Sequence, residues 1–105
     1  MADFRKEGNN MNQVALITGG TRGIGKEIAL TLAKEGYDIA LNYRSENEEL
    51  SKLKQEIEAN NVKCLTVKGD VSSFEGCEQF VKQTIQEFGK IDVLVNNAGI
   101  TKDTL

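Results

Sequence analysis

Hydrophobic positions along the chain follow two alternating spacings. Residues 14–17 (VALI) form a short, continuous apolar run, which is typical of a strand covered on both faces; a glycine follows one residue later, at position 19. Similar runs at 39–41 and 91–95, together with the pair Leu65 and Val67, predict three further strands.

Between these strands the apolar residues recur every three or four positions, the spacing of one face of a helix. The first of these stripes ends near Gly36, a residue type that commonly terminates helices. Two Ser-x-x-Glu patterns, Ser45 with Glu48 and Ser72 with Glu75, resemble capping boxes at helix starts. The three stripes are Ile24, Ile28 and Leu32; Leu50, Leu53 and Ile57; and Phe74, Cys77, Val81, Ile85 and Phe88.

The resulting order is β-α-β-α-β-α-β with short connections. Alternation of strands and helices predicts right-handed crossovers and a parallel sheet with helices on its faces. The chain contains no proline, which suits uninterrupted helices and central strands. Residues 1–12 are polar and are predicted to be a flexible arm, so the folded part covers residues 13–105.

Composition narrows the possible functions. The chain has 39% hydrophobic and 28% charged residues, and its net charge is −3; this indicates a folded domain and argues against a nucleic-acid or anionic-membrane partner. There is no membrane-length apolar run and no signal-peptide core in the sequence. With two cysteines interpreted as buried, reduced thiols, these features predict a cytoplasmic protein. The absence of histidine and of a CxxC pattern makes a protein-ligated metal site unexpected.

The segment TGGTRGIG lies between the first predicted strand and the first predicted helix. Gly19 would permit a sharp turn at positive φ. Gly23 would let a pyrophosphate approach backbone N–H groups at the helix start, and Gly25 would let the helix lie close to the sheet. The spacing is Gly-x-x-x-Gly-x-Gly, and its position predicts a dinucleotide-binding loop. A glycine-rich turn without a ligand is the alternative.

The end of the second strand indicates which dinucleotide is preferred. An acidic residue there would bind the ribose 2′-hydroxyl of NAD, whereas a basic residue suits the 2′-phosphate of NADP. The chain has Arg44 at this point, with Arg22 in the glycine loop as a second guanidinium, and Asp38 lies at the wrong end of the strand. The two arginines favour NADP(H); the alternative is that they are solvated surface residues.

Three motifs in this order resemble the short-chain dehydrogenase/reductase family. They are TGGTRGIG (18–25), GDV (69–71) and NNAG (96–99), and the closing IDVLVNNAGITKDTL is especially similar to bacterial 3-oxoacyl-acyl-carrier-protein reductases. The resemblance covers residues 13–105. It implies a Rossmann-type sheet of which these residues form the N-terminal part, with NADP(H) as cofactor. The implied reaction is NADPH-dependent reduction of a β-ketoacyl thioester in fatty-acid synthesis, with an acyl-carrier-protein-linked substrate.

The resemblance also implies roles for individual residues. Asp70 would contact the adenine amino group, and the NNAG segment would border the ribose and nicotinamide. Taken as turn residues alone, Asp70, Asn96 and Asn97 would need no ligand. The full set of expected cofactor-binding residues is Gly19, Gly20, Thr21, Arg22, Gly23, Ile24, Gly25, Arg44, Asp70, Val71, Asn97, Ala98 and Gly99.

No catalytic residue is expected in this chain. The family's chemistry needs a serine and a tyrosine with a lysine four residues later, whereas Tyr37 precedes Leu41 and Tyr43 precedes Asn47 by that distance. The resemblance also implies further strands beside the fourth one. Without them the fourth strand would be an apolar sheet edge, which predicts self-association. Two other functions stay open: a non-catalytic nucleotide-binding or interaction module, and part of a short-chain reductase acting on a sugar, steroid or small ketone.

Overall fold

Strands and helices alternate along the chain in the predicted order. The computed structural model describes residues 12–45 and 48–97. Its strands are β1 (Val14–Thr18), β2 (Asp38–Tyr43), β3 (Cys64–Lys68) and β4 (Val93–Asn96), and its helices are α1 (Gly23–Lys34), α2 (Glu48–Glu58) and α3 (Phe74–Phe88). The predicted Rossmann-type fold is confirmed.

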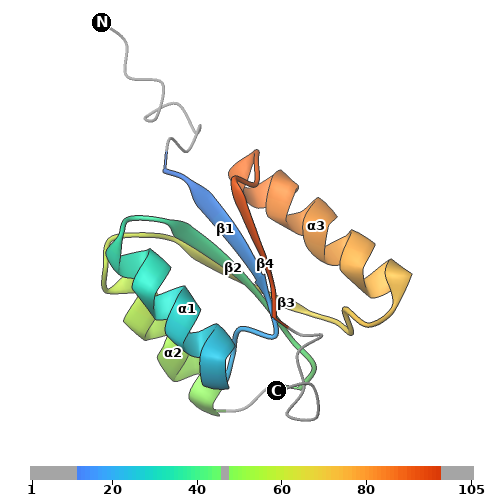
Figure 1. The fold of residues 1–105 in the computed structure, drawn as a ribbon, viewed down its shortest axis with the longest axis horizontal. Coiled ribbons are helices and arrows are strands. Elements are labelled where there is room, and N and C mark those ends of the chain that lie inside the picture. The colour runs from blue at the N-terminus through green and yellow to red at the C-terminus, as the bar shows by residue number, and fades with distance from the viewer. Residues whose placement is uncertain (1–11, 46–47, 98–105) are drawn as a thin grey trace, which may run out of the picture.

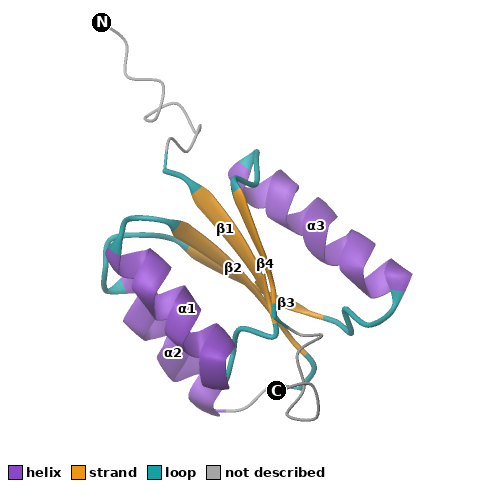
Figure 2. Ribbon diagram, viewed as in Figure 1, coloured by secondary structure: helices purple, strands orange, loops and turns teal. Residues whose placement is uncertain are grey.

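The four strands form one parallel sheet in the order β3-β2-β1-β4. The chain first moves outward from β1 to β3 and then returns across the sheet to place β4 on the other side of β1. Because right-handed crossovers in opposite directions lie on opposite faces, α1 and α2 cover one face and α3 covers the other (Figures 1 and 2). The direction in which successive strands are added to the sheet reverses between β1 and β4. Sheets of this kind bind ligands at such a point, beyond the carboxyl ends of the strands.

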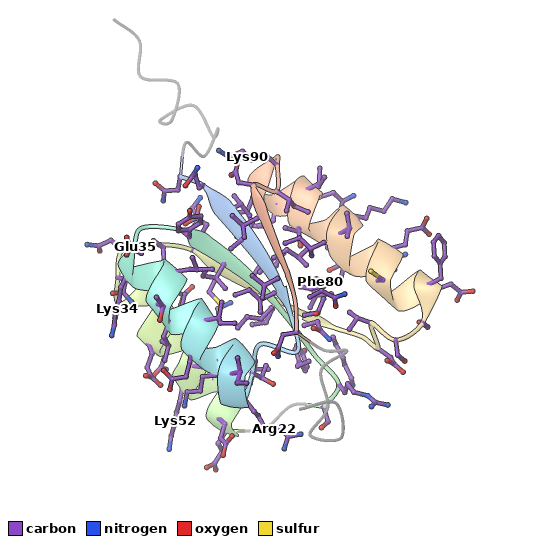
Figure 3. The ribbon with its side chains drawn as sticks, viewed as in Figure 1. Arg22, Lys34, Glu35, Lys52, Phe80 and Lys90 are labelled. Atoms are coloured by element: carbon purple, nitrogen blue, oxygen red, sulfur yellow. The ribbon has the colours of Figure 1, made fainter. Side chains whose placement is uncertain are left out.

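Alternate residues of β1 supply the two hydrophobic cores, as the two-residue period of a strand requires. Ala15 and Ile17 pack on the α1–α2 face. Val14 and Leu16 pack on the α3 face, where Figure 3 shows Phe80 between α3 and the sheet. All five residues of β1 are buried, so the continuous apolar run at 14–17 correctly predicts a doubly covered strand.

The expected buried face of α1 is wrong by one residue. The helix buries Gly25, Ala29 and Ala33, whereas Ile24 is 55% exposed. Small side chains let the helix backbone lie close to the sheet. The larger Ile28 and Leu32 of the predicted stripe pack at the side of this face, partly buried against the core. For α2 the prediction is confirmed, since Leu50, Leu53 and Ile57 are its buried residues.

The expected face of α3 is correct at Phe88, which is buried, and at Val81, which packs partly buried against the core on this face. It is wrong at the other positions. The helix buries Phe80, Thr84 and Phe88, while Phe74 is 79% and Ile85 is 45% exposed. Thr84 can be buried because its hydroxyl donates a hydrogen bond to the Phe80 carbonyl at 2.8 Å, which satisfies its polar group.

The two cysteines differ in their surroundings. Cys64 is buried as expected, whereas Cys77 is exposed and corrects that expectation. Burial raises the pKa of the Cys64 thiol to about 12, because desolvation disfavours the thiolate. Cys64 therefore behaves as a small core residue at neutral pH.

The start of α3 also differs from the capping pattern. Ser73, not Ser72, is the N-cap residue, and its hydroxyl accepts a hydrogen bond from the Gly76 N–H at 3.0 Å. The Ser72 hydroxyl instead donates to the Asp70 carboxylate. The other capping pattern includes residues 46–47, which lie outside the described residues, as does the predicted arm up to residue 11.

Within residues 12–45 and 48–97, no helix has both the length and the apolar character needed to cross a membrane.

At the amino ends of the strands, Asp92 joins β4 to β1. Its carboxylate accepts a hydrogen bond from the Val14 N–H at 2.7 Å, and its own N–H donates to the Val14 carbonyl at 2.8 Å. Lys90 lies 3.3 Å from the same carboxylate. The Val14 N–H bond, with a smaller contribution from Lys90, lowers the pKa of Asp92 below its ordinary value of 3.8.

We expect Asp92→Asn to weaken the dependence of stability on acid pH. A carboxylate whose pKa is lowered by folding stabilises the folded state above the ordinary value of 3.8, and this contribution is lost as the pH falls through the lowered pKa. Urea unfolding from pH 7 down to pH 3 should therefore show a smaller loss of free energy of unfolding in the variant. Glu87→Gln, an exposed position on α3, is the control, and an unchanged acid slope in Asp92→Asn would contradict the assignment.

Candidate nucleotide-binding site

The backbone of Gly19 is held from both sides by two side-chain amides. Its N–H donates to Asn42 Oδ1 at 2.6 Å, and its carbonyl accepts from Asn97 Nδ2 at 2.9 Å. Asn42 belongs to β2 and Asn97 follows β4, so the loop after β1 is fixed by both neighbouring strands. Gly19 has φ +65°, which confirms the predicted turn at positive φ.

Asn42 continues this connection to the third strand. It is only 4% exposed, and its Nδ2 donates to the Gly69 carbonyl at 3.3 Å. The Gly69 N–H in turn donates to the Tyr43 carbonyl at 2.8 Å. On the other side, the Thr18 hydroxyl lies 3.2 Å from Asn96 Oδ1. Hydrogen bonds therefore link the carboxyl ends of all four strands.

Close packing explains two of the loop glycines. A Cβ on Gly25 would lie 2.5 Å from the Gly19 carbonyl oxygen and 2.6 Å from Asn97 Nδ2. A Cβ on Gly20 would collide with the Leu41 side chain and lie 3.1 Å from Ile17 Cγ2. Gly20 is thus required by the core beneath the loop. Gly25 is required because α1 packs closely against the turn at Gly19 that Asn42 and Asn97 hold, which we call the clamped turn.

Gly23 differs, because the space in front of it is open. Its φ is +59°, and a Cβ there would meet no atom within 4 Å. The preceding residue, Arg22, is the N-cap of α1, yet its side chain makes no capping hydrogen bond, and the first turn contains no acidic residue. The first N–H groups of a helix lack intrahelical partners and carry partial positive charge. The amino end of α1 is therefore suited to an anion.

An ion pair lies beyond β2 and β3. The Arg44 guanidinium is 3.6 Å from Asp70 Oδ2, with the side chains 79% and 47% exposed. Asp70 Oδ1 accepts hydrogen bonds from the Ser72 hydroxyl at 2.6 Å and from the Ser72 N–H at 2.9 Å. These two bonds, and to a lesser extent Arg44, lower the pKa of Asp70. Its carboxylate is therefore ionised at neutral pH.

Comparison with known proteins places this geometry in a family. The family model described as short chain dehydrogenase matches residues 13–105. The chain belongs to the short-chain dehydrogenase family. It is 47% identical over 96 residues to a Bacillus subtilis protein named Uncharacterized oxidoreductase YhdF, covering 91% of this chain and 33% of that protein. It is 44% identical over 95 residues to the 3-oxoacyl-acyl-carrier-protein reductase FabG of Staphylococcus epidermidis, covering 90% and 39%.

Solved structures of the family agree with the fold. The 3-oxoacyl-acyl-carrier-protein reductase from Brucella melitensis, in complex with NAD, matches with a TM-score of 0.77 and 38% identity, over 88% of this chain and 35% of that one. The chain thus spans between a third and two-fifths of the length of these curated relatives.

Most of the expected site residues of this short-chain dehydrogenase family member lie at one end of the sheet. The glycine loop, Arg44, Asp70 and Asn97 all follow strand ends, and Figure 3 shows Arg22 at the same end of the molecule. Val71 is half-buried against the α3-face core, and Ile24 lies exposed on α1. Ala98 and Gly99 lie outside the described residues. Across the described ranges, no group of histidine, cysteine, aspartate and glutamate could hold a metal ion.

Two contributors to the site are absent from the expected set. Asn42 is a polar residue near the end of the otherwise apolar segment after Asp38. Its place in a predicted strand of a sheet covered by helices is the signal that could have identified it, since buried amides need partners. Ser72 fits a capping pattern equally well, so its bond to Asp70 could be found only from the structure.

We expect Gly25→Ala to destabilise the protein even though alanine is the better helix former. The added Cβ would displace the Gly19 carbonyl or the Asn97 amide, and such overpacking costs roughly 1–3 kcal/mol. Urea unfolding measures the change. Gly69→Ala is the matched control, because a Cβ there meets no atom within 4 Å; equal stability of the two variants would contradict the close approach of α1.

Proposed function

We propose that this chain forms the NADP(H)-binding part of a short-chain reductase whose reaction is the reduction of a 3-oxoacyl thioester carried by acyl carrier protein. The observation that carries the proposal is the uncapped amino end of α1 beside the open Gly23. A pyrophosphate there would receive backbone N–H bonds and the favourable end of the helix dipole. The clamped turn at Gly19 holds these donors in place before a ligand arrives.

The strand ends on either side suit the two halves of a dinucleotide. Arg44 follows β2 where the adenosine ribose of a dinucleotide would lie, and no acidic residue stands in Tyr43 to Ser45. We assign Arg44, supported by Arg22, to the 2′-phosphate, and Asp70 to the adenine side. Asn97 and the following Ala98 and Gly99 are assigned to the side of the nicotinamide and its ribose.

The bound cofactor would supply a hydride. In the proposed reaction this hydride adds to the keto carbon, and a proton adds to its oxygen, so that the β-ketoacyl thioester and NADPH become a β-hydroxyacyl thioester and NADP⁺. The residues of this chain bind and orient the nucleotide, and none of them is assigned to proton transfer. The relative named 3-oxoacyl-acyl-carrier-protein reductase supports this substrate class.

Calorimetric titration of the purified chain with NADPH and with NADH tests the cofactor assignment. We expect NADPH to bind more tightly, and Arg44→Asp to weaken NADPH binding at least tenfold, because hydrogen bonds to charged groups contribute about 1.5–3 kcal/mol. Binding of NADH should change much less in this variant.

Lys34→Asp is the control, since it reverses a charge at the far, carboxyl-terminal end of α1. Absence of binding by either nucleotide would contradict the proposed function, and equal binding of the two would contradict the NADP preference. The matching Brucella melitensis structure holds NAD, which is why both nucleotides are titrated.

We also propose that the chain associates with itself through β4. This strand lies at one edge of the described sheet, contains no charged residue, and has its Leu94 side chain 64% exposed. Val93 and Val95 pack on the α1–α2 face, so Leu94 points to the α3 face. The opposite edge strand, β3, ends in the exposed Lys68. Charged residues protect sheet edges from pairing, and β4 lacks this protection.

Sedimentation of the chain at micromolar concentration should therefore show dimers or larger species. Leu94→Lys places a charge on the unprotected strand and should shift the population toward monomer. Gln55→Lys adds the same charge at an exposed position on α2 and should leave association unchanged. A wild-type chain that sediments as a single monomer would contradict the proposal.

A further inference from the structure

The Arg44–Asp70 ion pair connects the loop after β2 to the loop after β3. The two loops are already adjacent, because the Gly69 N–H donates to the Tyr43 carbonyl at 2.8 Å. The guanidinium nitrogen lies 3.6 Å from Asp70 Oδ2. An exposed pair of this kind adds little to folding stability, but it places the Arg44 guanidinium beside Asp70.

Asp70 is the fixed member of the pair. Its Oδ1 accepts two hydrogen bonds from Ser72, at 2.6 and 2.9 Å, and Oδ2 faces Arg44. These bonds keep the carboxylate ionised and its orientation set. Arg44, by contrast, is 79% exposed, and without the carboxylate its side chain would sample many rotamers in solvent.

A guanidinium has five N–H donors in a rigid plane. Contact with Asp70 through one terminal nitrogen leaves the remaining N–H groups available to a second anion. A positioned arginine loses less rotational freedom when it binds a phosphate than a mobile one does, and this difference increases affinity.

We propose that Asp70, held by Ser72, is a positioning residue that presents Arg44 to the 2′-phosphate of the nucleotide. This inference rests on the proposed function, and it assigns to Asp70 a part in selecting NADPH over NADH. The alternative role, a contact between Asp70 and adenine alone, gives a different result, because adenine is common to both nucleotides.

The test is the ratio of NADPH to NADH affinity in Asp70→Asn, measured by calorimetry. Positioning predicts that NADPH affinity falls about two- to tenfold, the range that corresponds to ordering one long side chain, with NADH affinity nearly unchanged. Equal loss for both nucleotides would show an adenine contact and overturn the inference. A rise in NADPH affinity would show repulsion between the carboxylate and the phosphate and would overturn it equally.

Variants at Ser72 provide a second measurement. Ser72→Ala removes the 2.6 Å hydroxyl bond to Asp70 and should lower the affinity ratio in the same direction, whereas Ser72→Thr retains a hydroxyl and should restore it. Failure of threonine to restore the ratio would overturn the relay from Ser72. Asp92→Asn is the control and should leave the ratio unchanged, because Asp92 lies at the opposite end of the sheet and, like Asp70, is paired with a basic residue, here Lys90.

The wild-type titration separates the two proposals. If the wild type shows no preference for NADPH, the proposed cofactor assignment fails and this inference fails with it. If the preference exists in the wild type and persists unchanged in Asp70→Asn, only the positioning role is overturned.

Discussion

The arrangement of the site depends on the two amides that hold the backbone of Gly19. Asn42 accepts its N–H at 2.6 Å, and Asn97 donates to its carbonyl at 2.9 Å. Both bonds are made by side chains from strands that neighbour β1 in the sheet, so the turn after β1 is fixed by the sheet rather than by its own sequence alone. The path of the chain into α1, and hence the direction of that helix, follows from this turn.

The same clamp explains why the amino end of α1 is open to a ligand. Gly25 lets the first turn of the helix rest against Gly19 and Asn97, which brings the unpaired N–H groups of that turn to the carboxyl edge of the sheet. Arg22 caps none of them. An anion that binds there would not have to order the loop, so the free-energy cost of binding is lower, which is the general benefit of preorganisation. Asn42 extends the clamp to Gly69 and so joins the amino end of α1, where we propose that a pyrophosphate binds, to the side that carries Arg44 and Asp70.

Much of the fold was predictable because it follows from local rules. Apolar runs at 14–17 and 39–41, the positive φ of Gly19 and the buried stripe of α2 all depend on short-range pattern. The faces of α1 and α3 were not predictable in this way, because both helices carry apolar residues on two adjacent sides. In α1 the side with glycine and alanine lies closest to the sheet, Ile28 packs only partly buried beside it, and Ile24 is exposed; the distance between the helix backbone and the sheet decides this. Within the site, the role of Asn42 depends on long-range contacts, with Gly19 and Gly69 more than twenty residues away, and spacing along the chain does not reveal such contacts.

Amide hydrogen exchange of the chain, followed by NMR without nucleotide and then with NADPH, tests the preorganised clamp most directly. The Gly19 amide should exchange slowly before any ligand is added, because Asn42 already accepts its N–H, whereas the amides of Gly23 and Ile24 should exchange quickly and become protected only when NADPH binds. A Gly19 amide that exchanges as fast as that of Gly23 in the free chain, and is protected only with nucleotide, would show that the ligand forms the turn and would contradict the account.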